Sequence, residues 1–151
     1  MIWQEFPLSC MRYEGTPAYL KILDQESRSI ILRLRRHPSV VMWCGGNELF
    51  NHWSRMTNQD LAIRLIERNC YDLDHYTPFI PTSPQMGMGH GWYCFVIPDG
   101  REVLQYFPQA RRTAYTEYGV SGVANLDVLQ QILPPEEQCP PKPGTAWELR
   151  H

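Results

Sequence analysis

The sequence predicts an α/β fold in which parallel strands alternate with helices. Three observations carry that prediction. Residues 39–44 (SVVMWC) form a continuous apolar, β-branched run, which is typical of a parallel strand buried on both faces. Amphipathic helical patterns lie on either side of this run, at residues 19–36 and 57–71. The expected order is therefore strand, helix, strand, helix, strand, loop, strand, helix.

The first elements are justified by short local signals. A strand is expected at residues 1–6, an apolar run with two aromatic side chains. In the helix at residues 19–36, acidic residues precede basic ones, an order that suits the helix dipole. The His37-Pro38 pair then ends this helix, because a residue before proline avoids the helical conformation.

The remaining elements are shorter and are separated by glycine and proline. They are expected in this order: a helix at 57–71, a strand at 78–81, a loop at 85–91, a strand or part of a longer loop at 92–97, a strand at 112–117, a helix at 123–133 and an irregular tail at 134–144. The tail contains five prolines, which disfavour regular structure there.

Composition excludes several classes of function. The chain has 151 residues, 43% of them hydrophobic and 20% charged, with a formal net charge of −2. We therefore expect no nucleic-acid partner, and no apolar run reaches membrane-spanning length. The first ten residues lack the pattern of a signal peptide, and no compartment is predicted. The five cysteines form no C-x-x-C pair, so we expect free, mostly buried thiols and neither a metal nor a cofactor.

Two glutamates follow predicted strands. Glu48 comes after the buried run and two glycines, and Glu117 ends the strand at residues 112–117. In parallel α/β barrels the loops after the strand ends build the active site. Two carboxylates facing each other across a pocket are what cleavage of a glycosidic bond needs. A glutamate after a strand is also commonly a solvated loop residue, so position alone leaves both interpretations open.

Three sequence strings resemble glycoside hydrolase family 2. Residues 33–48 (RLRRHPSVVMWCGGNE) are similar to its acid/base segment, residues 114–119 (AYTEYG) to its strand-7 segment, and residues 2–6 (IWQEF) to its strand-3 segment. The resemblance implies a retaining glycoside hydrolase. It implies Glu48 as the catalytic acid/base, Glu117 as the nucleophile and Asn47 as the residue that hydrogen-bonds the substrate 2-hydroxyl.

The resemblance also implies a fold and partners. Residues 1–133 would form a partial (β/α)8 TIM barrel, roughly strands 3 to 7 with their helices, and residues 134–151 a proline-rich irregular tail. A complete barrel takes ~250 residues, and strands 1, 2 and 8 have no candidates. The missing remainder of the barrel and the N-terminal β-sandwich domains of a parent chain are therefore expected partners. We expect the isolated chain to be unstable or self-associating, with little or no activity.

The string WCGGNE is similar to the β-mannosidase branch of that family, and so are residues 72–84. This implies hydrolysis of terminal β-mannosides or related β-glycosides. Thr77 stands where that branch has arginine, and Thr116 replaces the commoner serine. Two alternatives stay open: a β-galactosidase or β-glucuronidase of the same family, and a truncated, non-catalytic carbohydrate-binding remnant.

Several aromatic and polar residues are further candidates for binding the sugar. For each, a structural role is the alternative: core packing, a polar rim or a flexible loop. The candidates are Trp3, Glu5, His90, Trp92 and Tyr118. Trp43 lies inside the buried run, and we expect it to belong to the core.

Overall fold

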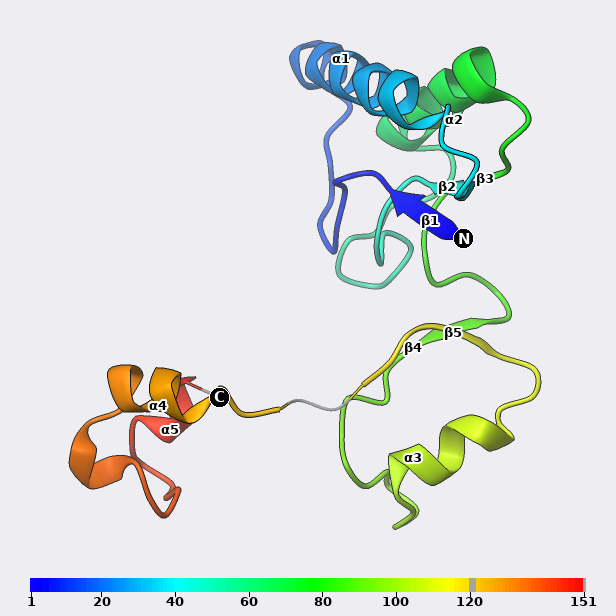
Figure 1. The fold of residues 1–151 in the computed structure, drawn as a ribbon. Helices are drawn as coiled ribbons and strands as arrows, with labels where there is room; N and C mark the ends of the chain where they lie inside the picture. The colour runs from blue at the N-terminus through cyan, green and yellow to red at the C-terminus, as the bar shows by residue number, and fades with distance from the viewer. Residues whose placement is uncertain (120–121, 151) are drawn as a thin grey trace. The chain divides into compact units, whose positions relative to one another are not determined.

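The computed structural model describes residues 1–119 and 122–150 and shows a mixed α/β fold with small parallel sheets (Figure 1). The chain divides into two compact units. The first comprises Met1–His90 and Ala110–Glu117, and the second comprises Gly91–Gln109 and the described part of Tyr118–His151. The predicted domain boundary at residue 133 stays a prediction.

The first unit is organised around a three-stranded parallel sheet. Its strands are β1 (Ile2–Glu5), β2 (Val40–Cys44) and β3 (Phe79–Ile80), hydrogen-bonded in that order. Beyond the strand ends, Asn47 continues the parallel pairing to Ser9 on one side and to Ser83 on the other. The segments that follow all three strands are thereby brought side by side.

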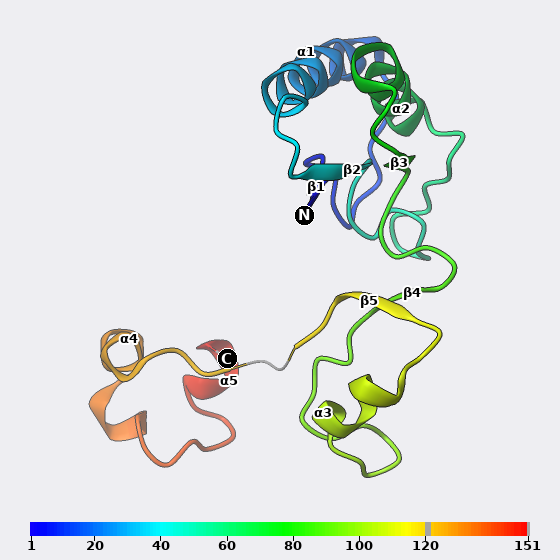
Figure 2. The ribbon, with the colours of Figure 1, turned by 45° about the vertical axis from the view of Figure 1, so that its right-hand side comes forward.

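Helices α1 (Pro17–Leu34) and α2 (Leu61–Asp74) lie next to each other and pack on this sheet (Figures 1 and 2). The core between them includes Ile31 and Ile66 from the helices and Trp43 from β2, all fully buried. Trp43 donates a hydrogen bond from Nε1 to Asp74 Oδ2 at 2.9 Å. The prediction that Trp43 belongs to the core is confirmed.

A side-chain cap explains where α1 begins, and a side-chain-bonded turn precedes the start of α2. Thr16 caps α1 by accepting a hydrogen bond from the Tyr19 amide, so this helix starts at Pro17, two residues before the predicted start. Thr57 and Asp60 are tied in a turn by the contact of Asp60 Oδ2 with the Thr57 amide at 2.7 Å. That turn delays α2 to Leu61, although a helix from residue 57 was predicted.

A second, two-stranded parallel sheet also belongs to the first unit. It pairs β4 (Met88–His90) with β5 (Ala114–Glu117), and His90 lies opposite Glu117. The prediction of a loop over residues 85–91 is therefore wrong at β4. This strand contains glycine and methionine without any alternation, and the partner that satisfies its backbone lies far along the chain. The strand predicted at residues 112–117 is present with a later start.

The second unit contains short helical segments. These are α3 (Val103–Tyr106), a 3-10 turn at Phe107–Gln109, α4 (Leu126–Ile132), a 3-10 turn at Pro135–Glu137 and α5 (Trp147–Arg150). The helix predicted at residues 123–133 is thus shorter than expected, and α3 was not predicted. Residues 92–97 form a loop, in which Val96 makes an isolated antiparallel bridge to Glu102.

Within residues 1–119 and 122–150 the strands form two separate small sheets and no closed barrel. The interpretation as part of a TIM barrel accordingly stays a prediction. Among the described helices, none combines the length and the apolar character that crossing a bilayer requires.

Candidate active site

Two glycines allow the three strand ends of the first unit to approach closely. A side chain at Gly45 would collide with the carbonyl oxygen of Pro81, and one at Gly46 with the carbonyl oxygen of Leu8. Without side chains at both positions, the backbone after β2 fits between its two neighbours. This packing explains the Gly-Gly pair that precedes Asn47 and Glu48.

Glu48 is held in an unusual backbone conformation. Its φ is +51°, a left-handed value that is uncommon outside glycine. Its amide donates to the carbonyl oxygen of Ser83 at 2.7 Å. Its own carbonyl oxygen accepts hydrogen bonds from Asn51 Nδ2 at 2.5 Å and from Ser54 Oγ at 3.0 Å. The side chain is 25% exposed and points to His90.

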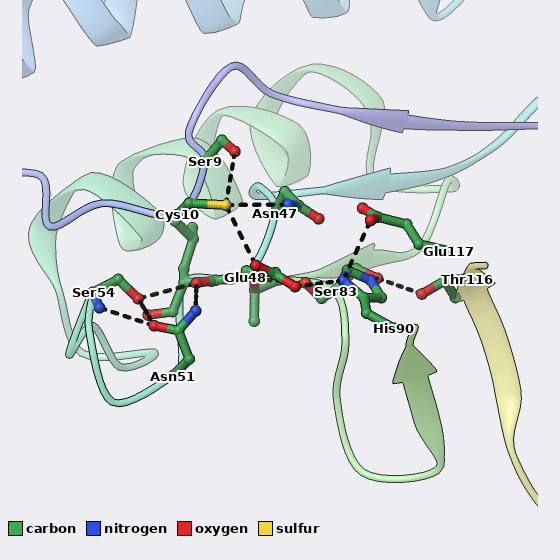
Figure 3. A network of polar contacts seen from close by, with 12 residues as sticks. Ser9, Cys10, Asn47, Glu48, Asn51, Ser54, Ser83, His90, Thr116 and Glu117 are labelled. Carbon is green, nitrogen blue, oxygen red and sulfur yellow. Dashed lines mark hydrogen bonds and ion pairs between the residues drawn. The ribbon is translucent and has the colours of Figure 1, made fainter. Parts of the chain in front are cut away.

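His90 brings the two predicted catalytic carboxylates together (Figure 3). Its side chain is 5% exposed, and its Nδ1 lies 3.0 Å from Glu48 Oε1 and 3.7 Å from Glu117 Oε2. Those two oxygens are therefore no farther apart than the sum of these distances. Glu117, at the end of β5, is more open to solvent, with 44% of its side chain exposed.

The other nitrogen of the His90 ring contacts a serine hydroxyl, which in turn contacts a threonine hydroxyl. Nε2 lies 2.9 Å from Ser83 Oγ, and Ser83 Oγ lies 2.7 Å from Thr116 Oγ1. Sequence reasoning assigned no role to Ser83 and noted Thr116 only as a replacement for serine. Serine and threonine are common in short strands and loops, so the sequence gives no sign of their role. Only the contacts that link Thr116 through Ser83 to His90 identify them as part of the site.

A thiol also contacts Glu48. Cys10 Sγ lies 3.4 Å from Glu48 Oε2 and 3.5 Å from Asn47 Nδ2. The expectation that the thiols are mostly buried is wrong, because Cys10 and Cys139 are exposed and Cys94 is partly exposed. Burial does raise the pKa of Cys44 to about 12 and likewise that of Cys70.

Asn47 also takes part in this arrangement. Its Oδ1 is shielded from solvent and has no hydrogen-bond partner within the part of the chain that the structure describes. A buried carbonyl oxygen without a donor is uncommon, and a donor from outside the described residues would satisfy it.

A cavity of about 590 Å³ is lined by residues of β1, of β5 and of the segment after β3. Its size is within the usual range for small-molecule pockets, about 300–1,000 Å³. Burial raises the pKa of Glu5, and the negative charge of Glu117 acts in the same direction. The lining residues are Trp3, Gln4, Glu5, Ser83, Tyr115, Thr116 and Glu117.

The two remaining candidates belong to the second unit. Trp92 is 39% exposed and meets Tyr106 edge-on, with ring centroids 6.3 Å apart. Tyr118 is 67% exposed and lies 5.2 Å from the ring of Phe107. Their roles in substrate binding stay predictions. Among the described residues, no group of three or more His, Cys, Asp or Glu side chains is arranged to hold a metal ion.

Comparison with known proteins gives distant but extensive similarity to one kind of enzyme. The chain is 29% identical over 163 residues to β-mannosidase B of Thermothelomyces thermophilus, covering 89% of this chain and 19% of that protein. It is 27% identical over 166 residues to β-mannosidase of Rattus norvegicus, covering 87% and 18%. No model of a known protein family matches the chain.

The chain resembles a segment of β-mannosidases. A solved structure, β-D-mannosidase from Dictyoglomus thermophilum, superposes with a TM-score of 0.66 and 24% identity over 91% of this chain and 19% of that one. At that identity the superposition shows a shared fold. The relatives named β-mannosidase support a glycoside hydrolase of that kind, and this chain spans about a fifth of their length.

Proposed function

We propose that this chain carries the catalytic acid/base and the nucleophile of a retaining glycoside hydrolase that acts on terminal β-mannosides or related β-glycosides. One observation carries the proposal: Glu48 and Glu117 converge on the same nitrogen of His90, at 3.0 and 3.7 Å. The two distances set an upper bound on the separation of Glu48 Oε1 and Glu117 Oε2, and the roughly 5–5.5 Å of retaining enzymes is compatible with that bound. The similarity to β-mannosidases supports a β-mannoside as the substrate.

Each carboxylate has a role in the proposed double displacement. Glu117 attacks the anomeric carbon while the glycosidic C–O bond breaks, and Glu48 gives its proton to the leaving oxygen. Water then attacks the glycosyl-enzyme, Glu48 takes up the proton of that water, and Glu117 is released. Asn47 would hold the 2-hydroxyl, and Trp3 and Glu5 lie on the cavity wall beside Glu117.

The remainder of the pocket is part of the proposal. Because this chain spans about a fifth of its curated relatives, we infer that further barrel strands complete the site. The open edges of β1 and of the β4–β5 sheet would then pair with those strands. The proposal is tested on the longest natural chain that contains this sequence and, in parallel, on the 151 residues alone.

Covalent trapping is the decisive experiment. The long chain is treated with a 2-deoxy-2-fluoro-mannosyl fluoride, digested and sequenced by mass spectrometry, with the Glu117→Gln variant as control. We expect one adduct, on Glu117, and none in the variant. Labelling of another residue would contradict the assignment. A panel of aryl β-glycosides compares mannoside with galactoside and glucuronide, and no turnover of any of them would favour a non-catalytic binder.

A further inference from the structure

We propose that Thr116, Ser83 and His90 form a directed hydrogen-bond chain that keeps the His90 ring proton on Nδ1 and makes Oε2 of Glu48 the oxygen that carries the transferable proton. The consequence for catalysis rests on the proposed role of Glu48 as acid/base. Ser83 and Thr116 are positioning residues in this proposal, since both act through His90 and not on the sugar.

Nδ1 of His90 determines the direction of the hydrogen-bond chain. This nitrogen faces two carboxylates, Glu48 Oε1 at 3.0 Å and Glu117 Oε2 at 3.7 Å. An ionised carboxylate only accepts hydrogen bonds, so Nδ1 carries the hydrogen whenever Glu48 is ionised. Only the shorter of the two distances is within hydrogen-bond reach, so the bond goes to Glu48. In a neutral ring Nε2 is then an acceptor and requires a donor.

Ser83 supplies that donor. Its Oγ lies 2.9 Å from Nε2 of His90, and once its single hydrogen is donated there it accepts from Thr116 Oγ1 at 2.7 Å. Donor and acceptor match at every step from Thr116 to Glu48. Ser83 is 1% exposed and the His90 side chain 5%, so water does not compete strongly for these groups.

The hydrogen-bond chain has a consequence for Glu48. With the ring hydrogen held on Nδ1 by the donor from Ser83, Glu48 Oε1 accepts from Nδ1 in both protonation states, because the carbonyl oxygen of a carboxylic acid is an acceptor as well. The acid proton is therefore placed on Oε2, the oxygen beside the exposed Cys10 thiol at 3.4 Å. The ionisable residues that line the cavity are Glu5, Tyr115 and Glu117.

The same connectivity occurs in nucleophile triads, in which serine meets histidine and histidine meets a carboxylate. Here Ser83 is 1% exposed, and its Oγ is also engaged with Thr116. Although Ser83 lies on the cavity wall, a hydroxyl that contacts both His90 and Thr116 and has so little exposed surface is not presented to an acyl substrate. The arrangement therefore serves to orient His90 and does not make Ser83 a nucleophile.

The position of the ring proton can be measured directly. The protein is labelled with ¹⁵N-histidine, and the His90 ring signals are assigned by their loss in His90→Gln. We expect the ring hydrogen on Nδ1. Thr116→Val should shift the ratio of the two tautomers toward Nε2–H by about fivefold, the effect of one neutral hydrogen bond. Thr116→Ser keeps the hydroxyl and should leave the ratio unchanged.

Three results would contradict the proposed hydrogen-bond chain: a hydrogen on Nε2 only, a doubly protonated ring, or identical ring signals in Thr116→Val and wild type. Kinetics on the long chain provide a second measurement. Thr116→Val should lower kcat more on a poor leaving group than on a good one, with KM little changed, and Thr116→Ser should not. If the enzyme is active and the two variants show the same dependence of kcat on the leaving group, this inference is contradicted and the proposed function is not. Absence of glycosidase activity in wild type would contradict the proposed function. The His90 ring signals would still test the hydrogen-bond chain independently.

Discussion

Asn51 donates a hydrogen bond from Nδ2 to the carbonyl oxygen of Glu48, at 2.5 Å. Ser54 Oγ reaches the same oxygen at 3.0 Å and also contacts Asn51 Oδ1. These bonds oppose the cost of the left-handed backbone at Glu48, about 1–2 kcal/mol for a residue with a Cβ. The loop after β2 thus holds the backbone of Glu48 while its carboxylate meets His90.

Removal of the Ser54 hydroxyl should destabilise the protein. Ser54 is fully buried, and Ser54→Ala leaves buried carbonyl oxygens without one donor, at a cost of about 1–3 kcal/mol in the free energy of unfolding. Urea unfolding followed by circular dichroism measures it. Ser29→Ala, at an exposed serine of α1, is the matched control and should change stability by less than about 0.5 kcal/mol. Equal midpoints for the two variants would show that the loop does not depend on this hydroxyl.

The effect of losing Glu48, the proposed acid/base, should depend on the leaving group. In Glu48→Ala of the long chain, hydrolysis of a substrate with a poor leaving group should fall about 10²–10⁴-fold, because its oxygen must be protonated as it departs. A nitrophenyl mannoside needs no such proton and should lose much less in the step that forms the glycosyl-enzyme, read from the burst of nitrophenol. Glu14→Ala, at an exposed glutamate, should behave like wild type. A uniform loss on both substrates would count against the acid/base role.

Ionisation of Glu5 should weaken the fold. Burial raises its pKa above the ordinary value of a glutamate, so the folded state binds this proton more tightly than the unfolded state. The contribution to stability is complete below the unfolded pKa and is lost as pH rises through the folded one. Glu5→Gln removes that loss, so the stability of the variant relative to wild type should increase as the pH rises above the pKa of the unfolded chain. Unfolding curves at several pH values measure the difference. The exposed Glu14→Gln should differ from wild type by the same free energy of unfolding at every pH. The same constant difference for Glu5→Gln would contradict the prediction.

Two isoleucines of α1 should respond very differently to truncation. Ile31 is 0% exposed in the core, and Ile31→Ala should cost about 2–5 kcal/mol of unfolding free energy. Ile22 is 57% exposed on the same helix, and Ile22→Ala should cost less than about 1 kcal/mol. Thermal and urea unfolding of both variants test this. Similar losses would mean that α1 does not pack on the sheet as described.

Local patterns accounted for the elements that carry their own signals. The buried run at β2 and the helical periodicity of α1 and α2 are readable because burial on one face dictates which side chains are apolar. Strand β4 lacks such a pattern, since its stability comes from pairing with β5, whose first residue lies 26 positions after Met88 in the chain. Helix α3, only four residues long, is too short to show a period.

The candidate site divides in the same way. The sequence by itself determined that Glu48 and Glu117 follow strands and sit in strings resembling one enzyme family, and it named His90 as a neighbour of the sugar. Only the tertiary structure decided that His90 lies against both carboxylates and that Ser83 and Thr116 close the other side of its ring. The physical reason is that hydrogen bonds between side chains from different loops and strands depend on distances of a few tenths of an ångström. Those distances are set by how the strands pair, and residue types along the chain do not encode them locally.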